Sequence, residues 1–406
     1  MADFARSTHP GVQAQLDRLQ MSSPSGDRLG LTRIRALLNQ LGRPQDHLPP
    51  VFHVVGTNGK GSTIAMLRAA IEAAGGTVHI FTSPHLVRFN ERIRVAGTLI
   101  EDEPLESLLI EVLDAGSGIE PSFFEVASAA ALLAFSRAPA TACLVEVGLG
   151  GRLDATNVFD RPAVCGIASI GFDHQQYLGH TLGEIAAEKA AISRAGVPIV
   201  ALAQPEEAER AIAASARAAR APLFLEGRDW TIDTSFKTSL AGAHQLRNAN
   251  LAWQMLARQS AVPVSRTAFT MGLDRAQWPA RLQRLADDGP LAHGMETWLD
   301  GAHNPDAAAA LARFLVGRPM HLVLGIMANK DADAIVALLS PHAASLTFVP
   351  LPDHQSHDPE TLAERFGGRA AASLEDALDG LPAPRLIAGS LYLAGAALAA
   401  NDELPD

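Results

Sequence analysis

The sequence predicts an α/β protein with two domains, of which the larger is N-terminal. Short runs rich in β-branched and apolar residues alternate with longer helical patterns along the chain, which is typical of a mostly parallel sheet with helices on both faces. The length of 406 residues exceeds what one ordinary hydrophobic core supports. Because the alternation restarts after about residue 290, we expect domains at residues 1–284 and 285–406.

The expected elements follow from the apolar runs and from the glycines and polar residues that separate them. In the N-terminal part, strands are expected at residues 51–55, 77–81, 142–148, 163–171 and 197–203. Helices are expected there at residues 62–76, 123–135, 182–196 and 244–259. The C-terminal part is predicted to be a smaller Rossmann-like α/β domain, with strands at residues 295–300, 320–326, 345–351 and 384–389.

Composition and charge exclude several classes of protein. Hydrophobic residues make up 48% and charged residues 19% of the chain, which indicates a globular protein. The formal net charge of −11 argues against nucleic acid and anionic membranes as partners. No apolar run approaches the ~20 residues of a membrane span, so we expect a cytoplasmic protein. Cys143 and Cys165 lie in apolar strand-like runs and predict buried thiols rather than a disulfide or a metal pair.

A glycine-rich stretch, "GTNGKGS" at residues 56–62, lies between the first predicted strand and a helix. Glycines allow a tight turn that presents backbone N–H groups to phosphate oxygens, and the helix adds the positive end of its dipole. A lysine and a serine at its end are typical of contacts to the β- and γ-phosphates and to Mg²⁺. The alternative is a plain strand-to-helix turn. We predict a P-loop-type ATPase domain with nucleotide contacts at Thr57, Asn58, Gly59, Lys60, Gly61 and Ser62.

Polar side chains follow three further predicted strands, at the edge where a parallel sheet binds ligands. Ser83 follows the second strand, Glu146 ends the third, and Asp173 and His174 follow the fourth. A carboxylate at the end of an apolar strand is costly unless it is paired or binds a metal. Glu146 therefore indicates either a salt bridge or a Mg²⁺ ligand. His174 is either a structural histidine or a further ligand of the metal.

Lys189 lies in the apolar helical stretch "IAAEKAAI". It either forms a surface pair with Glu188 or is partly buried, in which case a lowered pKa favours its reaction with carbon dioxide. The carbamate so formed would offer two oxygens to a second Mg²⁺. In the stretch "TSPHLVRFNERI", residues 82–93, Arg88 and Arg92 either bind carboxylates or form a solvated surface.

The predicted second domain carries its own polar strand ends. Asp300 and His303 follow one strand, and Ser390 follows another, where it either belongs to a site or begins a helix as its N-cap. Asn248 and Arg281 lie near the junction of the two domains. Arg281 is either a phosphate contact or an exposed helix charge.

A series of motifs in one order carries a resemblance to a known family. They are "GTNGKGS", "TSPHLVRFNERI", "EVGLGGRLDATN", "SIGFDH", "LGHTLGEIAAEK", "HQLRNA", "WPARLQ", "DGAHNP" and "GSLYLAG". The resemblance as a whole runs from about residue 30 to residue 395. The chain resembles folylpolyglutamate synthase/dihydrofolate synthase, in the Mur ligase superfamily. The resemblance implies ATP-dependent ligation of L-glutamate to dihydropteroate and to the γ-carboxylate of reduced folates, through an acyl phosphate.

The resemblance also implies roles for individual residues. Metal ligands would be Ser62, Ser83, Glu146, His174 and Lys189, and ATP would also contact Asn248, Arg281 and Asp300. Catalytic positions would be Lys60, Lys189, His303, Arg92 and Ser390. The pteroate or folate would lie at Pro84, His85, Arg88, Phe89, Phe124, Arg152 and Asp154, with Phe123 as a further flat apolar wall. The cofactors implied are ATP, two Mg²⁺ ions and a K⁺ ion, and the implied oligomeric state is a monomer.

Three positions depart from the family pattern, and three alternatives stay open. Ala191, Ala280 and Asn329 stand where glycine, glycine and aspartate are usual, which bears on local backbone geometry and substrate range. The first alternative is an enzyme with only one of the two ligase activities. The second is a Mur-type peptidoglycan ligase, and the third is a regulatory nucleotide-binding protein without catalysis.

Overall fold

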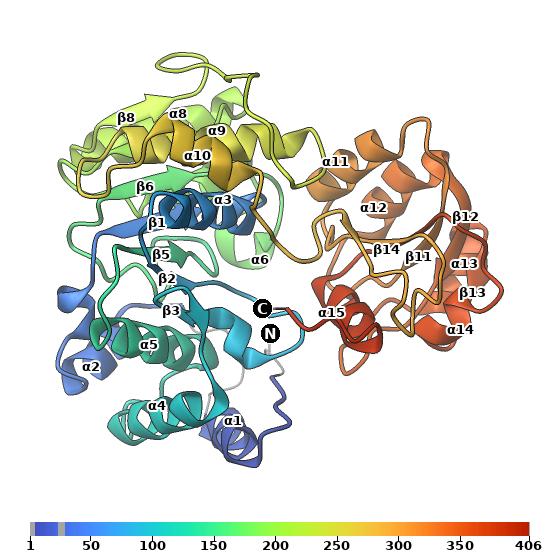
Figure 1. The fold of residues 1–406 in the computed structure, drawn as a ribbon, viewed down its shortest axis with the longest axis horizontal. Helices are drawn as coiled ribbons and strands as arrows, with labels where there is room; N and C mark the ends of the chain where they lie inside the picture. The colour runs from blue at the N-terminus through green and yellow to red at the C-terminus, as the bar shows by residue number, and fades with distance from the viewer. Residues whose placement is uncertain (1–4, 23–28, 406) are drawn as a thin grey trace. The chain divides into compact units, whose positions relative to one another are not determined.

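The computed structural model describes residues 5–22 and 29–405, which form two compact units (Figure 1). The first unit comprises Met1–Ser239 and Leu246–Ala276, and the second comprises Leu240–Gln245 and Gln277–Asp406. The second unit therefore begins before residue 285, where the sequence placed the division. The reason is that β9 (Gln283–Arg284) pairs antiparallel with β10 (Thr297–Leu299) and belongs to the second sheet.

The first unit contains an eight-stranded sheet in the order β4-β3-β2-β5-β1-β6-β7-β8. Its strands are β1 (Val51–Val55), β2 (Val78–Phe81), β3 (Ile93–Val95), β4 (Thr98–Leu99), β5 (Ala142–Glu146), β6 (Val164–Ile167), β7 (Ile199–Ala201) and β8 (Leu223–Leu225). Only the edge strands β3 and β4 are antiparallel to their neighbours. The central strands are buried along their whole length, as expected for a parallel sheet covered on both faces.

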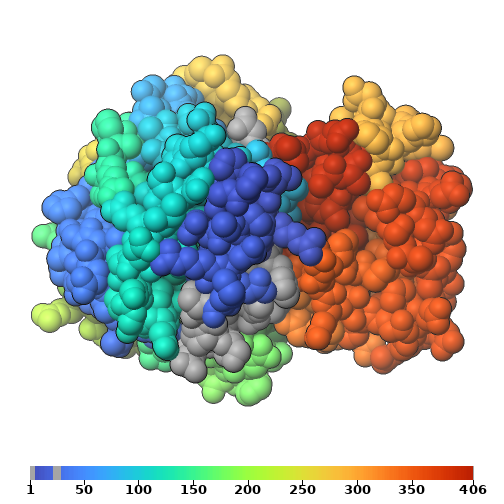
Figure 2. Space-filling view, turned by 90° about the horizontal axis from the view of Figure 1, so that it is seen from below, coloured from blue at the N-terminus to red at the C-terminus, as the bar shows by residue number. Residues whose placement is uncertain are grey.

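Helices cover both faces of this sheet. They are α1 (Pro10–Ser22), α2 (Thr32–Gln40), α3 (Lys60–Ala73), α4 (Asp102–Ala115), α5 (Phe123–Ser136), α6 (Gln175–Leu178), α7 (Leu182–Ala190), α8 (Glu206–Ala219), α9 (His244–Ala257) and α10 (Arg266–Leu273). Helices α3 and α10 pack together, as do α7 and α8, and α1 lies on α4 at the surface (Figure 2). Two short 3-10 helices, η1 (Pro44–His47) and η2 (Phe89–Arg92), complete the unit.

Capping residues set where the helices near the strand ends begin. Ser122 and Glu125 form a reciprocal capping box at the start of α5, and Thr181 and Glu184 do the same for α7. Helix α7 ends at Ala190, earlier than the expected residue 196. The Ser193 hydroxyl donates to the Ala190 carbonyl at 2.5 Å, so a side chain satisfies a carbonyl at the end of the helix.

The second unit contains a six-stranded sheet in the order β13-β12-β11-β14-β10-β9. Its remaining strands are β11 (Met320–Leu324), β12 (Ala343–Phe348), β13 (Arg369–Ala370) and β14 (Arg385–Ala388), all parallel to their neighbours. The helices are α11 (Pro305–Leu315), α12 (Ala332–Leu339), α13 (Pro359–Phe366), α14 (Leu374–Leu378) and α15 (Leu391–Ala400), with the 3-10 helix η3 (Ser340–His342). The prediction of two mostly parallel α/β sheets is confirmed. Among the described residues, no helix combines the length and apolar character needed to cross a membrane.

Candidate active site

The glycine-rich loop connects β1 to α3 and is shaped by Gly59. This residue has φ +89°, a left-handed conformation that glycine adopts without strain. A Cβ atom at this position would lie 2.6 Å from the Oδ1 atom of Asn248. The loop therefore needs glycine for two reasons. Asn248 of α9, to which the resemblance assigns a contact with ATP, lies beside it.

Hydrogen bonds connect this loop to the segment that follows β6. The backbone N–H groups of Thr57 and Asn58 donate to the Ser169 carbonyl at 2.7 and 3.2 Å. The Thr57 hydroxyl donates to the Gly171 carbonyl at 3.0 Å and accepts from the Gly171 N–H at 3.0 Å. The loop and the residues directly before the "FDH" segment, which lie far apart in the sequence, are therefore neighbours at one edge of the sheet.

Two lysines and a glutamate meet at the start of the glycine-rich loop. The Lys60 ammonium donates to the carbonyls of Gly56 and Thr57, both at 3.2 Å, and lies 3.7 Å from Glu146 Oε1. The Lys189 ammonium donates to the same Gly56 carbonyl at 3.1 Å. The structure thus brings together three of the predicted site residues from β5, α3 and α7.

Lys189 is buried, with 5% of its surface exposed. Burial lowers its pKa to about 7, and the positive charge of Lys60 acts in the same direction, whereas Asp173 and Asp154 oppose the shift. Glu188, the alternative surface partner, instead forms an ion pair with the exposed Arg152 at 2.8 Å. A large fraction of Lys189 is therefore an uncharged amine near neutral pH, which is the form that reacts with carbon dioxide.

The loop that follows β2 is held together by Glu91. Its two carboxylate oxygens accept hydrogen bonds from the backbone N–H groups of Leu86, Val87 and Arg88 at 2.6 to 2.8 Å. Burial raises the pKa of Glu91, and these hydrogen bonds oppose the rise. The loop leaves Pro84 exposed and Ser83 and Arg88 half-buried, whereas His85 and Phe89 are buried.

Arg92 lies in the interior of this loop, with 0% of its surface exposed. Its Nε donates to His85 Nδ1 at 2.8 Å, and its guanidinium carbon lies 5.6 and 5.4 Å from the ring centres of Phe89 and Phe123. The resemblance implies a catalytic position for Arg92. In this structure its guanidinium is enclosed by protein, and its Nε is bonded to His85.

Aromatic rings line the neighbouring strand ends. The Phe124 ring lies 5.8 Å from that of Phe81, and it occupies the space that a Cβ atom on Gly148 would need. Phe89 and Phe123 pack edge to face at 5.8 Å. Phe124 is half-buried at the start of α5, so it offers a flat apolar surface beside the backbone of the turn that follows β5.

In the second unit, Asp300 follows β10 and organises its loop. Its two carboxylate oxygens accept from the N–H groups of Leu282 and Ala302, both at 2.9 Å. Burial raises its pKa, while Arg281 and these hydrogen bonds oppose the rise. His303 Nδ1 lies 2.8 Å from the Gly301 carbonyl. A carbonyl accepts only, so Nδ1 is the donor in this hydrogen bond.

Ser390 follows β14 but is buried, and its hydroxyl oxygen accepts from the Tyr392 N–H at 3.0 Å. It therefore begins α15 as an N-cap, which is the structural alternative considered from the sequence. Asp154 is likewise buried, with 2% of its surface exposed, and it accepts hydrogen bonds from its own turn.

Comparison with known proteins decides the family. Residues 280–386 match the glutamate ligase domain of Mur ligases. The dihydrofolate synthase/folylpolyglutamate synthase of Bacillus subtilis is 38% identical over 323 residues, covering 72% of this chain and 73% of that protein. The chain belongs to the folylpolyglutamate synthase/dihydrofolate synthase family. It is an ATP-dependent amide ligase.

Two solved structures of this ligase family are similar over nearly the whole chain. The E. coli enzyme in complex with DHPP and ADP has a TM-score of 0.87 at 28% identity and covers 98% of this chain and 99% of its own. A bifunctional folylpolyglutamate synthase/dihydrofolate synthase with Mn, AMPPNP and L-glutamate bound has a TM-score of 0.85 at 28% identity, covering 97% and 98%. The fold of this ligase is therefore that of the family in both units.

The donor atoms near the glycine-rich loop of this ligase suit a hard divalent cation. Ser62 opens α3, Glu146 ends β5, and both are buried. His174 has φ +51° before α6, and its Nε2 lies 3.9 Å from Asp173 Oδ1. Within residues 5–22 and 29–405, no cluster of three or more His, Cys, Asp or Glu side chains is arranged as a metal site. A cation here would need hydroxyl, phosphate or water oxygens as well, which is how Mg²⁺ is usually bound.

The sequence analysis did not single out His53 or His244 of the ligase. His53 is buried in the middle of β1, and His244 is half-buried at the start of α9, where desolvation together with Arg281 and Arg313 lowers its pKa to about 4. A histidine inside an otherwise apolar strand is the signal that would have revealed His53.

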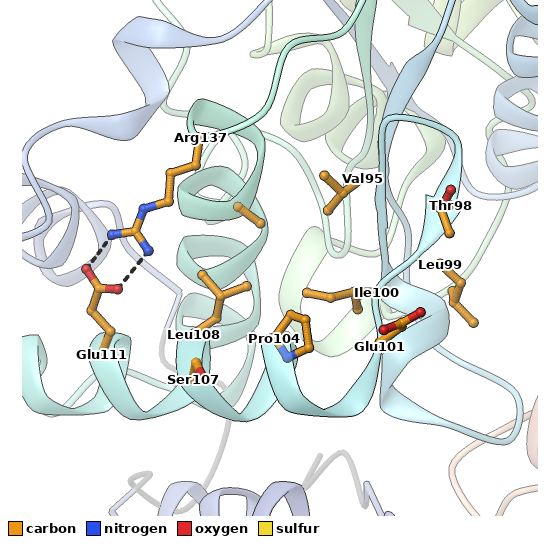
Figure 3. A pocket seen from close by; sticks show the side chains of 11 residues that line it. Val95, Thr98, Leu99, Ile100, Glu101, Pro104, Ser107, Leu108, Glu111 and Arg137 are labelled. Atoms are coloured by element: carbon orange, nitrogen blue, oxygen red, sulfur yellow. Dashed lines mark hydrogen bonds and ion pairs between the residues drawn. The ribbon is translucent and has the colours of Figure 1, made fainter.

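A separate cavity of about 450 Å³ lies between the β3–β4 hairpin, α4 and the end of α5. At its edge, Arg137 and Glu111 form an ion pair with two hydrogen bonds (Figure 3). Its lining contains none of the predicted site residues.

Proposed function

We propose that this ligase joins L-glutamate to dihydropteroate and also to the γ-carboxylate of reduced folates, with release of ADP and phosphate. The observation that carries the proposal is the meeting of Lys60, Glu146 and Lys189 at the Gly56 carbonyl. This group lies at the end of β1, two strands away from β2 and its aromatic-lined loop. A phosphate-binding group next to a flat apolar surface suits the phosphorylation of a carboxylate on an aromatic acid.

The chemistry follows from the poor reactivity of a carboxylate. A carboxylate oxygen of the acceptor takes the γ-phosphoryl group of ATP, and ADP leaves. The amine of glutamate then attacks the acyl carbon, and the bond to phosphate breaks to release it as the amide forms. The Lys60 ammonium offsets charge on the transferring phosphoryl group. For that role it exchanges its present carbonyl partners, Gly56 and Thr57, for phosphate oxygens.

The nucleotide contacts proposed are the residues of the glycine-rich loop together with Asn248, Arg281 and Asp300. ATP and a divalent cation are the cofactors, and Mg²⁺ is the cation proposed. Ser62, Ser83, Glu146 and His174 are the residues proposed to hold it. A bound Mg²⁺ would neutralise charge on the phosphates. The buried carboxylate of Glu146 supports this assignment, because it ends β5 beside Lys60 rather than facing solvent.

We propose that Lys189 becomes a carbamate. Its uncharged amine nitrogen attacks the carbon of carbon dioxide, and the proton that it loses passes to solvent. The product carries one negative charge, shared by two oxygens, in a buried position. In the unmodified lysine, Nζ lies 3.1 Å from the Gly56 carbonyl oxygen. Burial and the lowered pKa of Lys189 support the reaction, because both favour the neutral amine.

The acceptor is proposed to lie against Phe124 with Pro84, His85, Arg88, Phe89 and Arg152 around it. Arg88 is the arginine of this loop with exposed surface, so it is the one proposed to bind the acceptor's carboxylate. His303 is the residue proposed to contact glutamate, since it follows β10 in the loop that Asp300 organises. Arg92 and Ser390 are proposed to support the site from within, because both are buried and bonded to protein groups.

The proposal extends to the physical state of the enzyme. We propose a cytoplasmic monomer that binds neither nucleic acid nor membranes, consistent with its net charge of −11. We also propose that K⁺ supports the reaction. Size-exclusion chromatography with light scattering tests the monomer, and ADP release in potassium buffer against sodium buffer tests the K⁺ requirement.

ADP release with two acceptors tests the two ligase activities. The purified protein receives ATP, Mg²⁺ and L-glutamate, with dihydropteroate in one reaction and tetrahydrofolate in another. We expect ADP release in both, and mass spectrometry should show each acceptor extended by one glutamate. ADP release with dihydropteroate alone would mean that the enzyme has a single activity. Release with neither acceptor, or with a UDP-sugar peptide instead, would end the proposal.

A further inference from the structure

A chain of buried hydrogen bonds runs from the middle of β1 to the turn that follows β5. The Nε2 atom of His53 lies 2.9 Å from the Thr156 hydroxyl oxygen, which in turn lies 2.5 Å from Asp154 Oδ1. All three side chains are buried, and His53 is 1% exposed. The partners come from segments 103 residues apart in the sequence. The chain of bonds therefore joins a central strand to a surface turn through the interior of the first unit.

The positions of the hydrogens in this series of hydrogen bonds follow from the groups that donate to the Asp154 carboxylate oxygens. The Thr156 N–H also donates to Oδ1 at 2.9 Å, and the Leu149 N–H donates to Oδ2 at 2.8 Å. With backbone donors on both oxygens, the carboxylate accepts, so the Thr156 hydroxyl gives its one hydrogen to Asp154. The hydroxyl oxygen is then an acceptor for the hydrogen on His53 Nε2. Burial lowers the pKa of His53 to about 3, so the ring stays neutral with its hydrogen on Nε2.

The turn that Asp154 holds lies between two parts of the proposed active site. At one end, the Phe124 ring occupies the space beside Gly148. At the other end, a Cβ atom on Gly151 would lie 2.7 and 2.8 Å from the carbonyl oxygens of Glu188 and Lys189. The Arg152 N–H also donates to the Glu188 carbonyl at 2.9 Å. A shift of this turn would therefore move both the apolar wall for the acceptor and the end of α7 that carries Lys189.

His53 lies between two apolar clusters on its face of the sheet. Val51, on the same face of β1, belongs to the apolar cluster that contains residues of α4 and α5. Val55, also on this face, belongs to the cluster that contains residues of α7 and α8. His53 lies between them, where the two groups of helices separate and where the turn is attached. An apolar side chain would fill this position without the cost of burying an imidazole and a carboxylate.

We propose that His53 and Thr156 are positioning residues for the ligation reaction. By fixing the Asp154 carboxylate, they set the place of the turn between Phe124 and Lys189. Asp154 then has a positioning role in addition to its proposed place beside the acceptor, because its oxygens accept hydrogen bonds from its own turn. The inference rests on the proposed function for the roles of Phe124 and Lys189, but the hydrogen-bond chain itself is measurable without catalysis.

Two matched variants of Thr156 test the inference. Thr156→Val keeps the shape of the side chain and removes the hydroxyl, whereas Thr156→Ser keeps the hydroxyl. We expect kcat/KM for the acceptor to fall about tenfold to a hundredfold in Thr156→Val and to stay within about threefold of wild type in Thr156→Ser. ADP affinity should change less than about twofold in both, since Ser169 and Gly171 anchor the glycine-rich loop.

Further measurements distinguish positioning from a merely structural role. If Thr156→Val lowers the melting temperature but leaves kcat and KM unchanged, or if both variants lose activity equally, the inference is overturned. His53→Gln, which keeps a donor, should likewise be more active than His53→Leu, and this pair serves if Thr156→Val does not fold. Equal activity of the two His53 variants would also count against the inference.

Nitrogen-15 NMR of the histidine rings reads the chain of bonds directly in the full-length wild-type protein. We expect His53 to be neutral with hydrogen on Nε2 between pH 5 and pH 9, as its lowered pKa requires. A hydrogen on Nδ1 in wild type would overturn the inference. If the wild type ligates no acceptor while its NMR shows the expected ring, the proposed function fails and the hydrogen-bond chain stands. In that case, the affinity for dihydropteroate tests whether His53 and Thr156 position the site, and this affinity should fall in Thr156→Val.

Discussion

Lys60 and Lys189 donate hydrogen bonds to the same backbone oxygen, the carbonyl of Gly56, at 3.2 and 3.1 Å. Two ammonium groups so close together repel each other, and the lowered pKa of Lys189 is partly a result of this repulsion. Glu146 Oε1 lies 3.7 Å from the Lys60 ammonium nitrogen. The arrangement pairs Lys60 with a carboxylate and lowers the pKa of Lys189, which suits the first for binding phosphate and the second for reaction with carbon dioxide.

Replacing Lys189 should remove ligase activity because its modified side chain is proposed to complete the site. We expect Lys189→Ala to lower kcat at least about a hundredfold, the range seen when a preorganised charged group is lost. The control is Lys237→Ala, since Lys237 is exposed and outside the proposed site. ADP release with both acceptors measures the effect, and added bicarbonate should raise wild-type activity in carbon-dioxide-depleted buffer. Full activity in Lys189→Ala would refute the proposed role.

The same lysine should make the free energy of unfolding depend on pH. Its pKa is about 7 when folded and near 10.5 when exposed, so between these values the unfolded chain binds more protons than the folded one. Stability therefore rises with pH across this window, by up to about 5 kcal/mol. Below pH 7, Lys189 is charged in both states, and burial of its charge destabilises the folded state by the full amount.

Urea unfolding of wild type and Lys189→Met at several pH values between 7 and 10 measures this dependence. The stability of wild type relative to the variant should increase as the pH rises. Buffers free of carbon dioxide keep the amine unmodified during the measurement. A difference that stays constant over this range would show that Lys189 is solvated or fully paired.

Gly59→Ala should weaken nucleotide binding through a steric conflict. The new Cβ atom would lie 2.6 Å from Asn248 Oδ1, in addition to the strain of φ +89°. Gly75→Ala is the matched control, because Gly75 has φ +86° but open space around it. Both variants should lose about 1 kcal/mol of stability from backbone strain. Calorimetry should show a loss of more than about tenfold in ADP affinity for Gly59→Ala alone, because only this substitution forces a neighbour of the nucleotide loop to move. Equal ADP affinities of the two variants would argue against this account.

Local pattern was sufficient to predict much of the fold and the edge of the sheet that carries the site. Apolar runs such as residues 51–55 and 142–146 are long enough to identify buried strands, and a parallel sheet brings the residues at their carboxyl ends together at one edge. The glycine-rich loop and Glu146 could therefore be placed at this edge from the sequence, whereas Lys189 was singled out from its apolar helical context. The early end of α7 was not predicted: at that end the Ser193 hydroxyl and N–H both donate to the Ala190 carbonyl.

Contacts between segments far apart in the sequence could not be predicted from local sequence pattern. Arg92 has the sequence context of a surface charge, and its burial depends on packing against Phe89 and Phe123. His53 and Thr156 lie 103 residues apart, and neither segment alone indicates that they meet. Resemblance supplied the motif residues, but it gave no indication of which of them reach the surface.

Arg88 and Arg92, four positions apart in one loop, should respond differently to the same substitution. Arg92→Met removes the donor to His85 Nδ1 and the charge enclosed by two aromatic rings. It leaves a buried ring nitrogen without that partner, so we expect a loss of about 2–4 kcal/mol of stability. Arg88 is half-buried, and Arg88→Met should cost less than about 1 kcal/mol.

Enzyme kinetics separates the two arginines further. Arg88→Met should raise the KM for the acceptor about tenfold or more, the expected effect of losing a charged hydrogen bond to a carboxylate. Arg92→Lys, which keeps the charge but lacks the geometry of Nε, should restore less than half of the lost stability because the bond to His85 is directional. Urea unfolding and steady-state ADP release on the variants supply both readouts. If Arg92→Met were as stable as wild type but had a raised KM, Arg92 would be a direct substrate contact, and its proposed action through His85 would be wrong.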